Sequence, residues 1–100
     1  MKQITKVLGV GLLALGAVTA HAQVNQVRVW AAACANCHGT DGRAVPGMAS
    51  LAGVDKNVIV QKMLDYKNDR IPATLMHQIA KGYTDDQIND IAAYFAAQKP

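Results

Sequence analysis

The chain has 100 residues, of which 51% are hydrophobic and only 5% are aromatic, and its formal net charge is +3. This length allows one small domain. No basic stripe with interleaved aromatic residues is present, which argues against a nucleic-acid-binding protein. Strand-like alternation, internal repeats and low-complexity segments are absent from the sequence as well.

The first 22 residues have the pattern of a secretory signal peptide. Lys2 and Lys6 form a basic start, residues 7–20 carry no charge, and Ala20-His21-Ala22 fits the small-x-small rule for cleavage. The uncharged run is shorter than the ~20 apolar residues of a membrane-spanning helix. We therefore expect cleavage after Ala22, a periplasmic location and no membrane insertion of the mature chain. An uncleaved membrane anchor is the alternative.

Cleavage would leave residues 23–100 as a single domain of 78 residues. It would carry eight Lys and Arg residues against seven Asp residues, a net charge near +1. A domain of this size has a thin core and usually needs a disulfide, a metal or a cofactor to stabilise it.

The first predicted helix begins after Asn25, a favourable N-cap residue. Val27, Trp30, Ala31 and Cys34 follow at the spacing of one helix face, so that Cys34 shares a face with core residues.

This helix ends in Cys34-Ala35-Asn36-Cys37-His38, the C-x-x-C-H pattern of covalent c-type haem attachment. Two cysteines on one turn can form thioethers with the two vinyl edges of one porphyrin. The histidine that follows can reach the iron from the same side. We therefore expect one haem c, held by Cys34 and Cys37, with His38 as the proximal iron ligand. The other ring nitrogen of His38 is expected to donate to a carbonyl of the 39–54 loop.

Other uses of the two cysteines fit less well. A disulfide across so short a loop would stabilise little. A thioredoxin-like redox motif requires a βαβ context, whereas the pattern here is helical throughout. A zinc site would need further ligands, and only His38 and His77 remain in the mature chain.

Residues 39–54 are rich in Gly, Ala and Ser, and we expect them to wrap one side of the cofactor. The second predicted helix runs from Asp55, its N-cap, to about Asn68. Its apolar stripe contains Ile59, Val60, Met63, Leu64 and Tyr66, against Lys56, Lys62 and Asp65.

Residues 68–72 break this helix, and Thr74 to Ala80 are expected to form a short helical turn that ends at Gly82. In the last predicted helix Thr84 and Gln87 fit a capping box, and Asp85 and Asp86 favour the positive end of the helix dipole. Its expected buried face consists of Ile88, Ile91, Ala92 and Phe95.

The sixth ligand of the iron is expected to be Met76, in the connection between Pro72 and Gly82. A methionine ligand raises the reduction potential of a haem. Met63 is expected to fill the core and Met48 to pack on the proximal side, while His77 is the alternative ligand.

With these features the mature chain resembles the class I c-type cytochromes over its whole length. The resemblance implies an all-α fold in which three main helices pack around one covalently attached haem. It also implies one-electron transfer rather than catalysis by this chain. A sensor or an enzyme with an open iron site is the competing class, and it would require Met76 to be absent from the iron.

Residues 73–84, with Met76 followed by Ile79-Ala80-Lys81-Gly82-Tyr83, are similar to the methionine loop of the monohaem cytochrome subunit of flavocytochrome c sulfide dehydrogenase. That resemblance implies an FAD-containing flavoprotein partner, from which this chain would accept electrons. The alternative is a diffusible cytochrome that donates electrons to a terminal oxidase or another respiratory complex. Two positions depart from the pattern: Ala49 replaces a common proline before Ser50-Leu51-Ala52, and His77 replaces a small residue.

Overall fold

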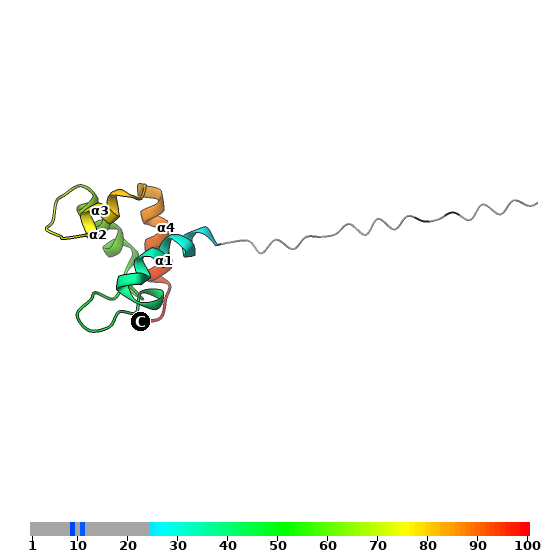
Figure 1. Ribbon diagram of the computed structural model, residues 1–100, viewed down its shortest axis with the longest axis horizontal. Coiled ribbons are helices and arrows are strands. Elements are labelled where there is room, and N and C mark those ends of the chain that lie inside the picture. Colours follow the sequence, from blue (N-terminus) through cyan, green and yellow to red (C-terminus); the bar gives the residue numbers. More distant parts are fainter. Residues whose placement is uncertain (1–8, 10, 12–24) are drawn as a thin grey trace, which may run out of the picture.

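The computed structural model describes Gly9, Gly11 and residues 25–100, and its elements are helical (Figure 1). They are α1 (Gln26–His38), the 3-10 helix η1 (Thr40–Gly42), α2 (Lys56–Lys67), α3 (Met76–Lys81) and α4 (Asp85–Ala96). The described residues contain no strand, and the prediction of an all-α fold is confirmed. The expected signal peptide and its cleavage site lie outside these residues, apart from Gly9 and Gly11.

The three long helices begin at the side chains that the sequence indicated. The Asn25 side chain accepts a hydrogen bond from the backbone N–H of Arg28 at 3.2 Å, and that of Asp55 accepts one from Asn57 at 2.9 Å. Each bond satisfies a backbone donor that has no partner within the helix. In the segment that the structure describes, no helix is long and apolar enough to cross a bilayer.

Helix α4 forms the centre of the core, because it packs against both α1 and α2. The predicted face of α4 is confirmed: Ile88, Ile91, Ala92 and Phe95 are all buried. The main buried partners of this face are Ala31 from α1 and Ile59 and Met63 from α2, together with Ala80 from α3.

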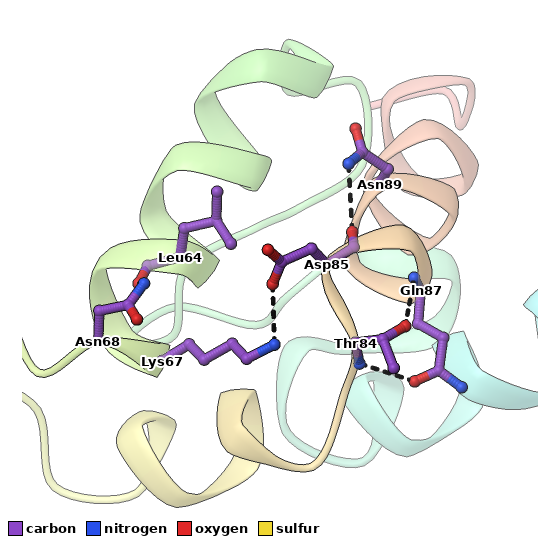
Figure 2. A network of polar contacts seen from close by, with 7 residues as sticks. All are labelled: Leu64, Lys67, Asn68, Thr84, Asp85, Gln87 and Asn89. Atoms are coloured by element: carbon purple, nitrogen blue, oxygen red, sulfur yellow. Dashed lines mark hydrogen bonds and ion pairs between the residues drawn. The ribbon is translucent and has the colours of Figure 1, made fainter.

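A polar network joins the end of α2 to the beginning of α4 (Figure 2). The Lys67 ammonium lies 2.8 Å from a carboxylate oxygen of Asp85. The amide of Asn68 donates to the carbonyl of Leu64 at 2.8 Å and closes the last turn of α2. The cation thus lies at the negative end of one helix dipole and the anion at the positive end of the other, which stabilises both ends.

The capping box of α4 is also visible in Figure 2. The Thr84 hydroxyl accepts from the Gln87 N–H at 3.1 Å, and the Gln87 side chain accepts from the Thr84 N–H at 2.9 Å.

We expect Thr84→Ala to reduce the free energy of unfolding by about 1 kcal/mol, since the backbone N–H of Gln87 loses the hydroxyl that accepts its hydrogen bond. In a domain of this size that change lowers Tm by roughly 4–8 °C. Thermal unfolding of the haem-containing protein measures it, and Thr84→Ser, which keeps the hydroxyl, should stay near the wild type. Equal losses in the two variants would contradict the role of the cap.

Two connections differ from the expectation. The loop after the haem motif contains η1, in which Asp41 has a left-handed φ of 52°. Helix α3 begins at Met76 rather than at Thr74. Its N-cap residue is Leu75, and no side chain makes a capping hydrogen bond there. Without a capping signal in the sequence, the start of so short a helix is decided by tertiary contacts.

Candidate haem site

A cavity of about 500 Å³ opens between the C-terminal end of α1, the 48–54 segment, α2 and the start of α3. This volume is within the ~300–1,000 Å³ that ligand pockets usually have. The lining is mostly apolar, and among the described residues that form it Lys62 is the one Lys, Arg, Asp or Glu. The lining residues are Ala33, Cys34, Cys37, His38, Met48, Ala49, Ser50, Leu51, Val54, Val58, Ile59, Lys62, Met63, Tyr66, Pro72, Ala73, Thr74, Leu75, Met76, Ile79, Ile91 and Phe95.

Both cysteines of the motif line this cavity, with Cys34 partly buried and Cys37 exposed. Both carry free sulfur atoms, which are not joined in a disulfide. Burial raises the pKa of the Cys34 thiol, with a smaller opposing effect from a backbone hydrogen bond. Cysteines of thiol oxidoreductases have the opposite perturbation, a lowered pKa, so the environment of Cys34 argues against that class.

The His38 imidazole lies at the same cavity, and one of its nitrogens has a fixed partner. Its Nδ1 lies 2.6 Å from the backbone carbonyl oxygen of Ala49. A carbonyl can only accept, so Nδ1 is the donor, and in the neutral imidazole Nε2 is then the nitrogen with the lone pair. This is the tautomer that a metal ligand requires, and the expected bond from His38 to the 39–54 loop is confirmed.

Backbone and side-chain bonds hold the loop that presents the Ala49 carbonyl. The backbone N–H of Ala44 donates to the Ser50 hydroxyl at 2.9 Å, across the base of the loop. The Gly42 carbonyl accepts from Leu51 at 2.7 Å and from Ala52 at 3.1 Å. These bonds restrain the loop although the proline of the resembling cytochromes is replaced by Ala49.

The last helix also holds η1, which directly follows the haem motif. The Tyr94 hydroxyl donates to a carboxylate oxygen of Asp41 at 2.7 Å, and Arg43 lies 3.3 Å from the other oxygen. The bond to Asp41 raises the pKa of Tyr94, because ionised Tyr94 would lose it and face a negative charge. The raised pKa keeps Tyr94 protonated, and this bond intact, into the alkaline range.

Three methionines and one histidine are candidates for the sixth ligand. Met76 is partly buried and lines the cavity at the first residue of α3. Met63, 8% exposed, belongs to the core as expected, and Met48 is 45% exposed in the loop on the His38 side; both also line the cavity. His77 does not line it, and its Nε2 lies 2.5 Å from the carbonyl oxygen of Ile71. The structure thus brings Cys34, Cys37, His38 and Met76 to one cavity and leaves His77 outside.

Two features of this cavity were not predicted from the sequence. Lys62 was grouped with the polar residues of the second helix, yet it lines the cavity, because a long lysine stem can follow apolar surface while its ammonium stays in water. Its spacing from Ile59 and Tyr66, three and four residues, puts it on their face and could have indicated this. Residues 72–75 also line the cavity, and no pattern in the sequence indicated that.

The donor set fits haem c better than a bare metal ion. Among the described residues no cluster of three or more His, Cys, Asp or Glu side chains could hold a metal by itself. An imidazole nitrogen with a free lone pair, a thioether sulfur and two free thiols at an apolar cavity match the attachments and axial ligands of a c-type haem.

Comparisons with known proteins agree with this site. Residues 23–95 match the family model described as cytochrome c oxidase, cbb3-type, subunit III. The chain is 42% identical over 62 residues to the cytochrome subunit of sulfide dehydrogenase from Chlorobaculum tepidum, covering 62% of this chain and 56% of that protein. It is 33% identical over 97 residues to cytochrome c4 from Pseudomonas aeruginosa, covering 96% of this chain and 47% of that protein.

A solved structure is similar as well. Cytochrome c4 from Acidithiobacillus ferrooxidans superposes with a TM-score of 0.63 at 40% identity, over 65% of this chain and 38% of that one. The chain spans about half the length of the two curated relatives named above. On the family match, the identities and the helical fold, the chain belongs to the class I c-type cytochromes, and its cofactor is covalently bound haem c.

Proposed function

We propose that this chain is a periplasmic one-electron carrier whose single haem c is held by thioethers to Cys34 and Cys37. In this proposal residues 1–22 are the signal peptide and residues 23–100 form the haem domain. His38 and Met76 are the axial ligands, and with both in place no position on the iron is open to a substrate. The haem then supplies one-electron chemistry and the protein supplies binding and orientation.

The observation that carries this proposal is the hydrogen bond from His38 to the Ala49 carbonyl. It leaves Nε2 as the acceptor nitrogen at a cavity that both cysteines and Met76 also line. The bond orients the imidazole and increases its basicity, as partners of metal-bound histidines generally do. The bond thus supports an orientation of His38 that suits an iron ligand.

We further propose that the electron donor is an FAD-containing sulfide dehydrogenase, with this chain as the haem subunit. The 42% identity to the cytochrome subunit of such an enzyme supports this assignment. The local resemblance of residues 73–84, around the proposed ligand Met76, also supports it. Sulfide oxidation would then take place on the flavoprotein, and this chain would receive the electrons singly.

A diffusible carrier is the second candidate, because cytochrome c4, whose name mentions no partner enzyme, matches a larger share of this chain. The match to cytochrome c4 covers 96% of this chain, whereas the match to the sulfide dehydrogenase subunit covers 62%. Such a carrier would exchange electrons with a respiratory complex through brief encounters.

Native chromatography of the periplasmic fraction distinguishes the two candidates. We expect haem absorbance to coelute with flavin absorbance at a mass well above that of this chain, and the haem in that fraction to be reduced when sulfide is added. The fraction treated with a flavoprotein-denaturing step serves as the control and should show no reduction. Elution as a small haem protein, with no response to sulfide when mixed with the flavin fractions, would favour the diffusible carrier.

A further inference from the structure

The segment between α2 and α3, residues 68–75, leads directly into the proposed distal ligand. Its last four residues, Pro72 to Leu75, line the cavity, and Met76 follows as the first residue of α3. Helix α3 has only six residues, and no side chain caps its start. A helix this short is not stable by itself, so the position of Met76 depends on what holds this segment in place.

Two side chains of α3 hold the segment from one face of the helix. His77 and Lys81 are four residues apart and therefore lie on the same face. The His77 Nε2 lies 2.5 Å from the Ile71 carbonyl oxygen, and the Lys81 ammonium lies 2.6 Å from Asp69. His77 Nδ1 is 3.9 Å from the same Asp69 oxygen. The segment is thus folded back against the helix that it precedes.

The contact of His77 is the stronger of the two restraints. Lys81 and Asp69 are exposed, with side chains 39% and 59% accessible, and exposed ion pairs contribute little. His77 is less accessible, at 25%, and its ring lies beside that of Tyr66, with 6.1 Å between the ring centroids. Because a carbonyl can only accept, Nε2 donates to it. The acceptor belongs to Ile71, directly before the first segment residue that lines the cavity.

From these contacts we propose that His77 is a positioning residue for the distal ligand. Its hydrogen bond to the Ile71 carbonyl keeps residues 68–75 folded against α3 and so holds the Met76 sulfur on the iron. This inference rests on the proposed ligation by Met76. It assigns a role to the histidine that stands where the resembling cytochromes have a small residue.

The test uses the haem-containing protein with three substitutions. His77→Ala removes the donor, His77→Gln keeps an N–H donor of similar reach, and Gln78→Ala is the control on the neighbouring exposed residue. Two readouts report on the distal side: the near-infrared sulfur-to-iron charge-transfer band of the oxidised protein, and the rate of carbon monoxide binding to the reduced protein. A residue that only stabilised the fold would change Tm without changing these readouts at low temperature.

We expect His77→Ala to bind carbon monoxide about three to ten times faster than the wild type. The loss of one net hydrogen bond would favour release of Met76 from the iron by about this factor. The rate for His77→Gln should lie close to that of the wild type, and Gln78→Ala should match the wild type. If His77→Ala does not incorporate haem, His77→Asn, which has a shorter donor, takes its place with the same expectation.

The outcomes distinguish a failure of the role proposed for His77 from a failure of the proposed ligation by Met76. A wild-type protein that has the band, with a His77→Ala variant that binds carbon monoxide at the wild-type rate, overturns the role of His77 and leaves the ligation by Met76 intact. A wild-type protein that lacks the band and binds carbon monoxide rapidly overturns both.

Discussion

Met76→Leu is expected to lower the reduction potential by on the order of 0.1 V, because axial ligands shift haem potentials within a range of about 0.8 V. A thioether ligand favours the reduced iron, and leucine cannot replace it. Leucine has nearly the volume of methionine, so the packing around α3 is affected little. The reduced variant should also bind carbon monoxide rapidly, since one position on the iron becomes open.

The cavity offers matched controls for this experiment. Met48 and Met63 also line it. The substitutions Met48→Leu and Met63→Leu each remove a sulfur from the same cavity without changing a residue of α3. Both variants should keep the sulfur-to-iron charge-transfer band and a potential near that of the wild type. Redox titration followed by absorbance measures the reduction potentials of the three variants and of the wild type. Loss of the band in Met48→Leu or Met63→Leu, with Met76→Leu unchanged, would assign the ligand to another methionine.

The Met76→Leu variant also tests His77 as the alternative ligand. To reach the iron, this side chain would have to give up its bond to the Ile71 carbonyl and leave the face of α3 that it shares with Lys81. Met76 requires no such rearrangement, because it already lines the cavity. A Met76→Leu variant with an unchanged potential and no carbon monoxide binding would show that a residue other than Met76 is the ligand.

Local chemistry explains which parts of the fold were predictable from sequence. The capping box of Thr84 and Gln87 and the four buried positions of α4 depend on spacing within one helix, and the structure has them as expected. The bond from His38 to the following loop was also predictable in kind, since a metal-ligating histidine needs a partner for its second nitrogen.

Contacts between distant or irregular segments were not predictable in the same way. The left-handed Asp41 in η1 is bonded to Tyr94, 53 residues later in the chain. The bond between His77 and Ile71 depends on how the 68–75 segment turns back, which no periodicity describes. Such features follow from the course of the chain in space, and the sequence offered only the residue types that allow them.

Replacing Gly39, which directly follows His38, is expected to have a large effect on stability. Its φ is +85°, and a Cβ atom there would lie 2.0 Å from the carbonyl oxygen of Arg43. Its N–H closes the end of α1 by donating to the Ala35 carbonyl at 3.0 Å, and its carbonyl accepts from Gly42 at 2.9 Å. A side chain at this position must therefore displace the backbone that joins the haem motif to η1.

Gly47 provides a control that separates the two causes of this cost. It also has a positive φ, +97°, but a Cβ atom there would have no neighbour within 4 Å. Gly47→Ala therefore introduces backbone strain alone, of about 1–3 kcal/mol. Gly39→Ala introduces comparable strain plus an overlap with backbone that cannot rotate away.

We expect Gly39→Ala to lose more than about 3 kcal/mol of unfolding free energy, a large fraction of the ~5–15 kcal/mol of a typical domain. Thermal unfolding of the two haem-containing variants, followed by circular dichroism and haem absorbance, measures the difference. Gly47→Ala should unfold several degrees below the wild type, and Gly39→Ala should fall much further or fail to retain a folded haem protein. Equal losses would mean that φ alone matters at both positions. A larger loss at Gly39 means that the close approach of Arg43 fixes the backbone after His38, and with it the loop whose carbonyl orients the imidazole.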